Sequence, residues 1–183
     1  MGRTEQQLEQ ASEHVKYEID MLRATVSFLT VSWSATDRVT RCAYLESFVL
    51  HLRNLSEFFY QQKKNHICAA DYVSDVDKWK RSRGAKSASL GREIRKANEF
   101  VAHLSYERCA KDKDRNWDWG IISAELQRLI GCFLSNLPPG RRALFSGCEE
   151  GPAGPTGTSS PPVDRGWTGP PEPPVPEKAK TSE

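Results

Sequence analysis

Residues 5–30 read EQQLEQASEHVKYEIDMLRATVSFLT, and this stretch decides the fold class. Its apolar residues recur at spacings of 7, 4, 3, 4 and 3, at Leu8, Val15, Ile19, Leu22, Val26 and Leu29. This spacing follows the helical turn and predicts one long amphipathic helix with a single apolar seam. The seam could pack inside a bundle or against a second copy of the chain, and its length favours the bundle.

Three further long helices are expected. The second covers residues 38–62, with Thr36 or Asp37 as its N-cap, and is apolar on nearly every side, which is typical of a central helix. The third covers residues 89–108, with apolar spacings of 4, 3, 4 and 3. The fourth covers residues 118–137 and ends where two prolines and a glycine follow.

Residues 63–88 form a long connection between the second and third helices, with a short helix expected at 75–81. A connection of this length is either functional or mobile. Alternating strand patterns are absent from the sequence, and residues 141–145 could add a last turn. The prediction is an all-α, up-down bundle of four main helices.

The chain changes character at Gly147. Nine of the eleven prolines lie at or after Pro152, and too few apolar residues remain to offset the entropy of ordering. We therefore expect a bundle domain at 1–146 and a disordered Pro/Gly-rich tail at 147–183. Residues 170–176 favour polyproline II and could dock in an aromatic groove, or the tail could serve solubility alone.

Composition narrows the setting. No segment has 18 consecutive apolar residues and the N-terminus lacks a secretory signal, so no membrane association and a cytoplasmic location are expected. The five cysteines form no CxxC pair, and His66 and Cys68 lack a second ligand pair, so neither a metal nor another cofactor is expected. Residues 1–146 carry 23 Lys and Arg against 18 Asp and Glu, a balance of +5 that tolerates a polyanionic partner.

The second helix carries a polar line. Glu46, Arg53 and Glu57 differ by 7 and 4 positions and so share one side of the helix, with Asn54 beside them. Charges on so apolar a helix must pair with one another or open onto a cleft or a partner. Alternatively, the line is a solvated stripe with Arg53 and Glu57 as an i,i+4 pair.

The third helix carries a second polar group. His103 follows Glu99 by four positions and precedes Tyr106 by three, and Arg92 and Arg95 lie on the same side one or two turns earlier. A histidine beside a carboxylate and a tyrosine suits general acid–base catalysis, and arginines suit bidentate phosphate binding. A surface histidine satisfied by Glu99 or water is the alternative.

The preceding connection is strongly basic. Residues 78–96 contain eight Lys and Arg and a single acid, and Lys80, Arg81 and Arg83 lie next to Trp79. A flexible basic loop with an interleaved aromatic predicts phosphate-backbone binding, with Trp79 as a stacking residue. The other interpretation is a solvated charged loop.

The chain resembles the HEPN superfamily over residues 38–137, through LESFVLHLRNLSEFF in the second helix and NEFVAHLSYER in the third. The resemblance implies a helical domain of toxin–antitoxin, abortive-infection or phage-defence systems. Active members are metal-independent ribonucleases that work as homodimers, and an antitoxin or defence protein would be a cognate partner. Their signature is an Arg followed after four to six residues by a His.

Carried onto this chain, His103 matches the family histidine and Tyr106 resembles the tyrosine that follows it in some subgroups. Asn98 stands where the arginine is expected, and Arg95 lies eight residues before His103. Arg53 could supply the guanidinium from the second helix. This departure from the pattern bears directly on catalysis.

Three functions stay open at this point. The first is an RNA-cleaving HEPN-like effector with His103 as general acid–base and Arg53, Asn98 or Arg95 near the phosphate. The second is a non-catalytic HEPN-like module that binds RNA or a partner protein. The third is a helical interaction domain without a nucleic-acid role.

Overall fold

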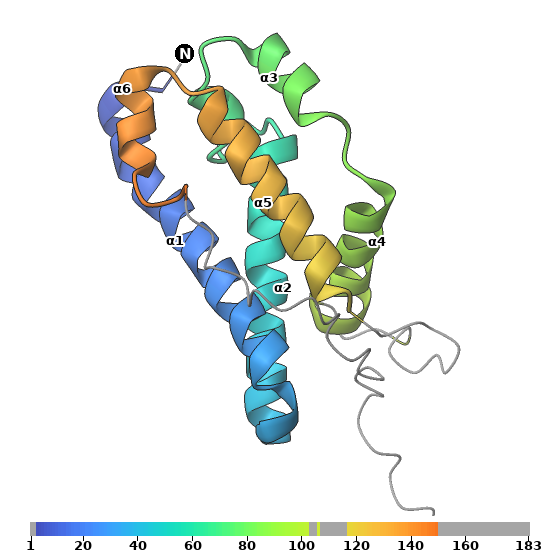
Figure 1. The fold of residues 1–183 in the computed structure, drawn as a ribbon. Helices are drawn as coiled ribbons and strands as arrows, with labels where there is room; N and C mark the ends of the chain where they lie inside the picture. Colours follow the sequence, from blue (N-terminus) through green and yellow to red (C-terminus); the bar gives the residue numbers. More distant parts are fainter. Residues whose placement is uncertain (1–2, 103–105, 107–116, 150–183) are drawn as a thin grey trace, which may run out of the picture.

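The computed structural model describes residues 3–102, 106 and 117–149. Every regular element within these residues is helical, which confirms the predicted all-α class. In Figure 1 the longer helices run alternately down and up, and the short α3 (Val76–Arg83) lies at one end of them. The long helices are α1 (Glu5–Val31), α2 (Arg38–Tyr60), α4 (Ala88–Ala97) and α5 (Trp119–Ser135).

The helix starts follow from side-chain caps. Thr4 and Gln7 form a reciprocal capping box at the start of α1. Asp37, one of the two predicted N-caps, accepts hydrogen bonds from the backbone N–H groups of Val39 and Thr40 at the start of α2. These caps bond N–H groups that have no partner within the helix, so they fix the residues at which α1 and α2 begin.

The core lies where α1, α2 and α5 meet. Its fully buried side chains include Ile19, Phe48, Leu52 and Leu126. At one end Phe133 is fully buried, and its ring contacts those of Phe58, Phe59, Tyr72, Trp79 and Phe145. Edge-on packing of this kind suits the quadrupoles of aromatic rings and adds to their burial energy. This aromatic cluster holds the α3 end of the molecule together.

The connection between α2 and α4 is more structured than the sequence suggested. It contains the short 3₁₀ helix η2 (Ala69–Asp71) and all of α3. The buried Tyr72 hydroxyl donates to the Leu8 carbonyl at 3.0 Å. Arg141 in α6 (Pro139–Arg142) donates to the Tyr72 carbonyl at 3.1 Å and pairs with Glu5. The connection is thus fastened both to the first helix and to the last one.

The third predicted helix is interrupted. Its α-helical part ends at Ala97, and Asn98–Ala102 continue as the π-helix η3. A π-turn bonds residues five apart, so it inserts one residue and rotates the later positions by about 100° relative to an α-helix. The predicted apolar stripe is nevertheless kept as far as Val101, because Leu90 and Ala97 are buried and Ile94 and Val101 pack against the core. Most of the remainder of residues 89–108 lies outside the described residues.

The described structure continues past the predicted boundary at 146, as far as residue 149. Cys148 is buried, and its carbonyl accepts a hydrogen bond from Arg23 at 2.7 Å. Gly147, with a φ of 87°, turns the chain back onto α1, and Glu149 pairs with Arg142 at 3.0 Å. Residues 150–183, including the polyproline stretch, lie outside the described part. Within the described residues, no helix has the length and apolar character needed to cross a membrane.

Candidate nucleic-acid interface

The basic connection is built on a buried tryptophan. Asp75 is the N-cap of α3, and Gly84 is its C-cap, with a φ of 72° that suits glycine. Trp79 is 1% exposed and packs against Phe59 and Phe133. The prediction that Trp79 stacks on nucleotide bases was therefore wrong, because its ring belongs to the core. Its burial instead sets which side of α3 faces the core, and so which directions the basic side chains of α3 take.

Tyr60 at the end of α2 is the aromatic side chain that faces these cations. The Arg83 guanidinium lies 4.5 Å from the centre of its ring, and the Lys86 ammonium lies 5.3 Å from it. The hydroxyl donates to the Ala85 carbonyl at 3.5 Å. Both cations are close enough for cation–π attraction. The side chain is half-buried, so Tyr60 ties the α3–α4 connection to α2 while part of it stays accessible.

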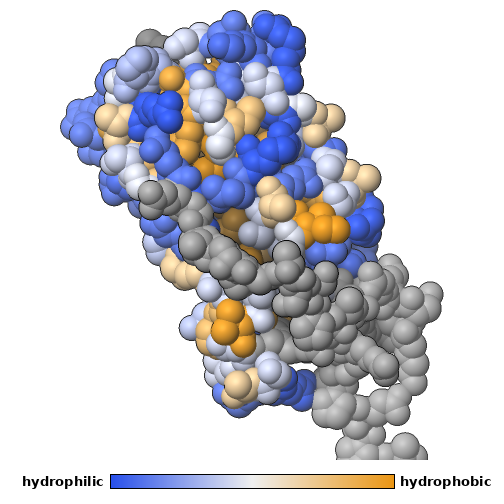
Figure 2. Space-filling view, viewed as in Figure 1, coloured by the Kyte–Doolittle hydropathy of each residue, from blue (hydrophilic) through white to orange (hydrophobic). Residues whose placement is uncertain are grey.

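Arg128 on α5 completes the cluster. It donates to the Arg83 carbonyl at 3.2 Å, and its charge acts against the raised pKa of the Tyr60 hydroxyl. We call the surface formed by five side chains the Tyr60 face: Tyr60, Lys80, Arg83, Lys86 and Arg128. In the described part of the chain, none of its four cations forms an ion pair. Figure 2 shows hydrophilic residues gathered over this α3 end of the molecule.

The electrostatics of the Tyr60 face reflect partial burial. Burial lowers the pKa of Lys86, with Glu57 acting against this shift and Arg83 reinforcing it. Burial likewise raises the pKa of the Tyr60 hydroxyl, and the carboxylate of Glu125 adds to that effect. Lys80 and Lys86 stay exposed, so their charge is accessible to an incoming anion.

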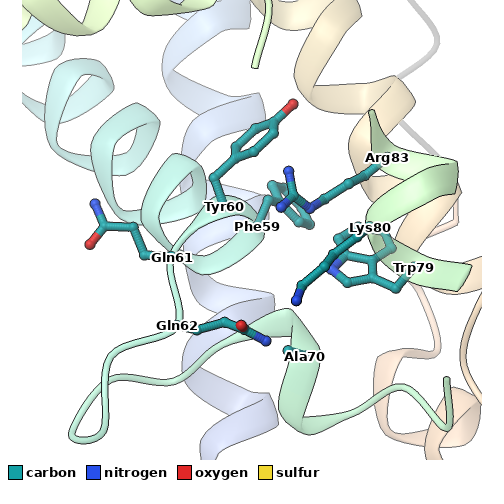
Figure 3. A pocket seen from close by; sticks show the side chains of 8 residues that line it. All are labelled: Phe59, Tyr60, Gln61, Gln62, Ala70, Trp79, Lys80 and Arg83. Carbon is teal, nitrogen blue, oxygen red and sulfur yellow. The ribbon is translucent and has the colours of Figure 1, made fainter. Parts of the chain in front are cut away.

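A hollow of about 160 Å³ opens beside Tyr60. Phe59, Trp79 and Ala70 form its apolar walls, and Lys80 and Arg83 bring positive charge to it. Figure 3 shows both cations reaching from α3 toward the end of α2, with Gln62 opposite Lys80 and Gln61 pointing away. The Nε atom of Arg83 is buried and has no hydrogen-bond partner among the described residues.

The predicted phosphate-binding residues divide into two groups. Lys80 and Arg83 meet at the hollow. Arg81 is exposed elsewhere on α3, and Arg92 and Arg95 are exposed on α4, where Arg92 contacts Glu93 at 3.4 Å. Sequence spacing could not separate these groups. The separation depends on which side of α3 faces the core, and the burial of Trp79 decides that.

The polar line on α2 is arranged differently from the prediction. Glu57 lies 3.9 Å from Lys63 and 3.6 Å from His66 rather than pairing with Arg53. Asn54 donates to Glu18 on α1 at 3.1 Å. Glu46 is exposed and Arg53 is half-buried. The internal pairing of Glu46, Arg53 and Glu57 is therefore absent from the described part of the chain.

The predicted catalytic group is only partly described. Asn98 and Glu99 lie in the π-helix, and the Asn98 Oδ1 atom is buried with no hydrogen-bond partner among the described residues. Tyr106 is 95% exposed. His103 lies outside the described residues, so its position relative to Arg53 does as well.

Two buried ionisable pairs were missed by the sequence analysis. His51 Nδ1 lies 2.7 Å from Glu18 between α2 and α1, and its side chain is 4% exposed. Lys96 lies 3.1 Å from Glu93 on α4, and both are buried. Spacing of three residues could have indicated the second pair. The first joins residues 33 positions apart, which periodicity within one helix does not reveal.

Comparison of the chain with protein-family models, characterised proteins and solved structures finds no significant match. Within the described residues no group of three or more His, Cys, Asp or Glu is placed to hold a metal ion. The geometry of the Tyr60 face is thus the main basis for a functional proposal.

Proposed function

We propose that this protein is an HEPN-like helical domain that binds RNA through the Tyr60 face. The observation that carries the proposal is the gathering of Lys80, Arg83, Lys86 and Arg128 around one half-buried tyrosine without ion-pair partners in the described part of the chain. Cations kept from carboxylates are available to phosphates, whose neutralisation supplies most sequence-independent binding to nucleic acid. Exposed Arg81 lies on the same helix and extends the positive surface.

RNA is chosen over other polyanions because of the resemblance at residues 38–137. The Tyr60 face presents an aromatic ring among its cations, and such a combination is typical of proteins that bind single strands. Single-stranded RNA is therefore the expected ligand.

The test is salt-dependent binding of a fluorescent single-stranded RNA to the full chain, measured by anisotropy. We expect affinity to fall steeply between about 50 and 200 mM salt. The double variant Arg83→Gln/Lys86→Gln should weaken binding about tenfold or more and reduce the salt slope by about 1.4. Lys16→Gln/Arg142→Gln removes the same charge from other surfaces and should bind nearly as the unaltered protein does.

Equal loss in both double variants would show that net charge, and not the Tyr60 face, governs binding. Binding that is absent, or that does not respond to salt, would contradict the proposal outright. Circular dichroism of each variant, with a thermal melt, checks that the fold is retained.

A second candidate function is metal-independent RNA cleavage with His103 as general acid–base. The π-helix Asn98–Ala102 immediately before His103 favours it, because such insertions are frequent at functional sites. Labelled RNA is incubated with the protein in EDTA, and His103→Ala should abolish cleavage while leaving anisotropy unchanged. Identical RNA profiles for the two proteins would remove this candidate and leave the binding proposal intact.

A further inference from the structure

The hollow beside Tyr60 is small and closed at its base. Its volume of about 160 Å³ is well below the roughly 300 Å³ at which pockets for whole small molecules begin. Phe59 is 2% and Trp79 is 1% exposed, so the hollow ends on the core. A polymer cannot thread through such a space, whereas the end of a polymer can enter it.

The polar groups of the hollow suit an anion. Lys80 and Arg83 are cationic, and none of the eight described residues that line it is acidic. The buried Arg83 Nε–H has no acceptor within the described residues, although buried donors nearly always have one. Gln62 adds an amide that can donate. Two cations therefore meet at a space large enough for one phosphate group.

We propose that the hollow binds the terminal phosphate monoester of an RNA strand, an inference that rests on the proposed RNA binding. A terminal monoester carries about −1.5 to −2 charge at neutral pH and three free oxygens, whereas an internal phosphodiester carries one charge. Lys80 and Arg83 match the larger charge, and the Arg83 guanidinium has further N–H groups that can donate to its oxygens. Lys86 and Arg128 do not line the hollow and are left for the next phosphates of the strand.

The experiment uses one single-stranded RNA sequence with an internal fluorophore in three forms: a 5′-phosphate, a 3′-phosphate, or hydroxyls at both ends. Anisotropy titrations with the full chain should show one phosphorylated form binding about tenfold more tightly than the hydroxyl form, as one added charge-assisted contact predicts. Which of the two forms gains affinity identifies the recognised end. Inorganic phosphate in excess should reduce the gain.

Matched variants assign the preference to the hollow. Lys80→Gln and Arg83→Gln should each bring the affinities of the phosphorylated and hydroxyl forms close together. Lys78→Gln removes the same charge from an exposed position of α3 outside the hollow and should keep their ratio. A ratio that persists in both Lys80→Gln and Arg83→Gln would overturn the assignment.

The outcomes separate this inference from the proposed function. Salt-dependent RNA binding that is equal for all three forms overturns terminal recognition and leaves RNA binding standing. Absence of binding to every form overturns both. A gain for one phosphorylated form, lost in Lys80→Gln and Arg83→Gln but kept in Lys78→Gln, supports both.

Discussion

Two clusters of charge in this bundle have opposite designs. On α4, Lys96 is buried against the Glu93 carboxylate at 3.1 Å. Around Tyr60, Arg83 and Lys86 lie over an aromatic ring, and neither forms an ion pair within the described residues. The first arrangement uses its charge inside the fold, and the second leaves its charge for a ligand. A basic residue is thus informative about function when its partner is known, and much less so when its position alone is known.

The largest expected effect breaks the buried pair. Lys96→Met leaves the buried Glu93 carboxylate with only the exposed Arg92 nearby, at 3.4 Å, and this should cost about 3 kcal/mol of unfolding free energy. Urea unfolding monitored by circular dichroism measures the loss. The double variant Glu93→Leu/Lys96→Met removes both charges and should recover most of it. If the double variant is as unstable as the single one, packing and not charge explains the effect.

A smaller effect is expected where α1 meets α2. Glu18 accepts a hydrogen bond from Asn54 and pairs with the buried His51. Glu18→Ala should therefore lower the unfolding free energy by about 1–3 kcal/mol, since it leaves His51 Nδ1 without its partner. Glu18→Gln keeps an oxygen at this place and should lose less. Equal losses in chemical denaturation would show that the partner oxygen contributes little.

Substitution of a cation on the Tyr60 face should affect RNA binding and leave stability nearly unchanged. Lys86→Gln is expected to change unfolding free energy by less than about 0.5 kcal/mol, because this cation has no ion-pair partner to lose within the described part. Its salt slope for RNA binding should fall by roughly one. A strongly destabilised Lys86→Gln protein would place this residue with the structural pairs and so remove the contrast.

The smallest effect concerns a surface cap and its pH dependence. Hydrogen bonds from Thr40 and the start of α2 hold the pKa of Asp37 below its usual range. A lowered folded-state pKa adds stability above the unfolded-state value of about 3.9, and this stability is lost as pH falls through the folded-state value. Asp37→Asn keeps a capping oxygen but cannot titrate, so its melting temperature should fall less between about pH 5 and pH 2. Parallel curves for the two proteins would contradict this.

The helices themselves were largely predictable from sequence. The seam of α1, the N-cap at Asp37 and the proline stop after α5 are local signals, and each depends on residues within a few turns. The π-helix that begins at Asn98 was not predictable in this way, because the apolar spacing of the preceding residues does not differ from that of an ordinary α-helix.

The candidate site was predicted in part. The basic run in residues 78–96 pointed to Lys80 and Arg83, which line the hollow beside Tyr60, but Trp79, the predicted stacking residue, is buried. A tryptophan in a charged segment serves stacking or core packing equally well, and local pattern does not distinguish the two. Arg128 joins the site from 45 residues farther along the chain than Arg83.

The sequence by itself determined where helices begin, which side of each is apolar, and that positive charge accumulates before α4. These properties follow from hydrogen bonding and spacing within one segment. The tertiary structure decided which charges are used internally and which remain available. That choice depends on distances such as those from Tyr60 to Arg83 and from Lys96 to Glu93, and on the burial of Trp79, which arise only when the helices pack against one another.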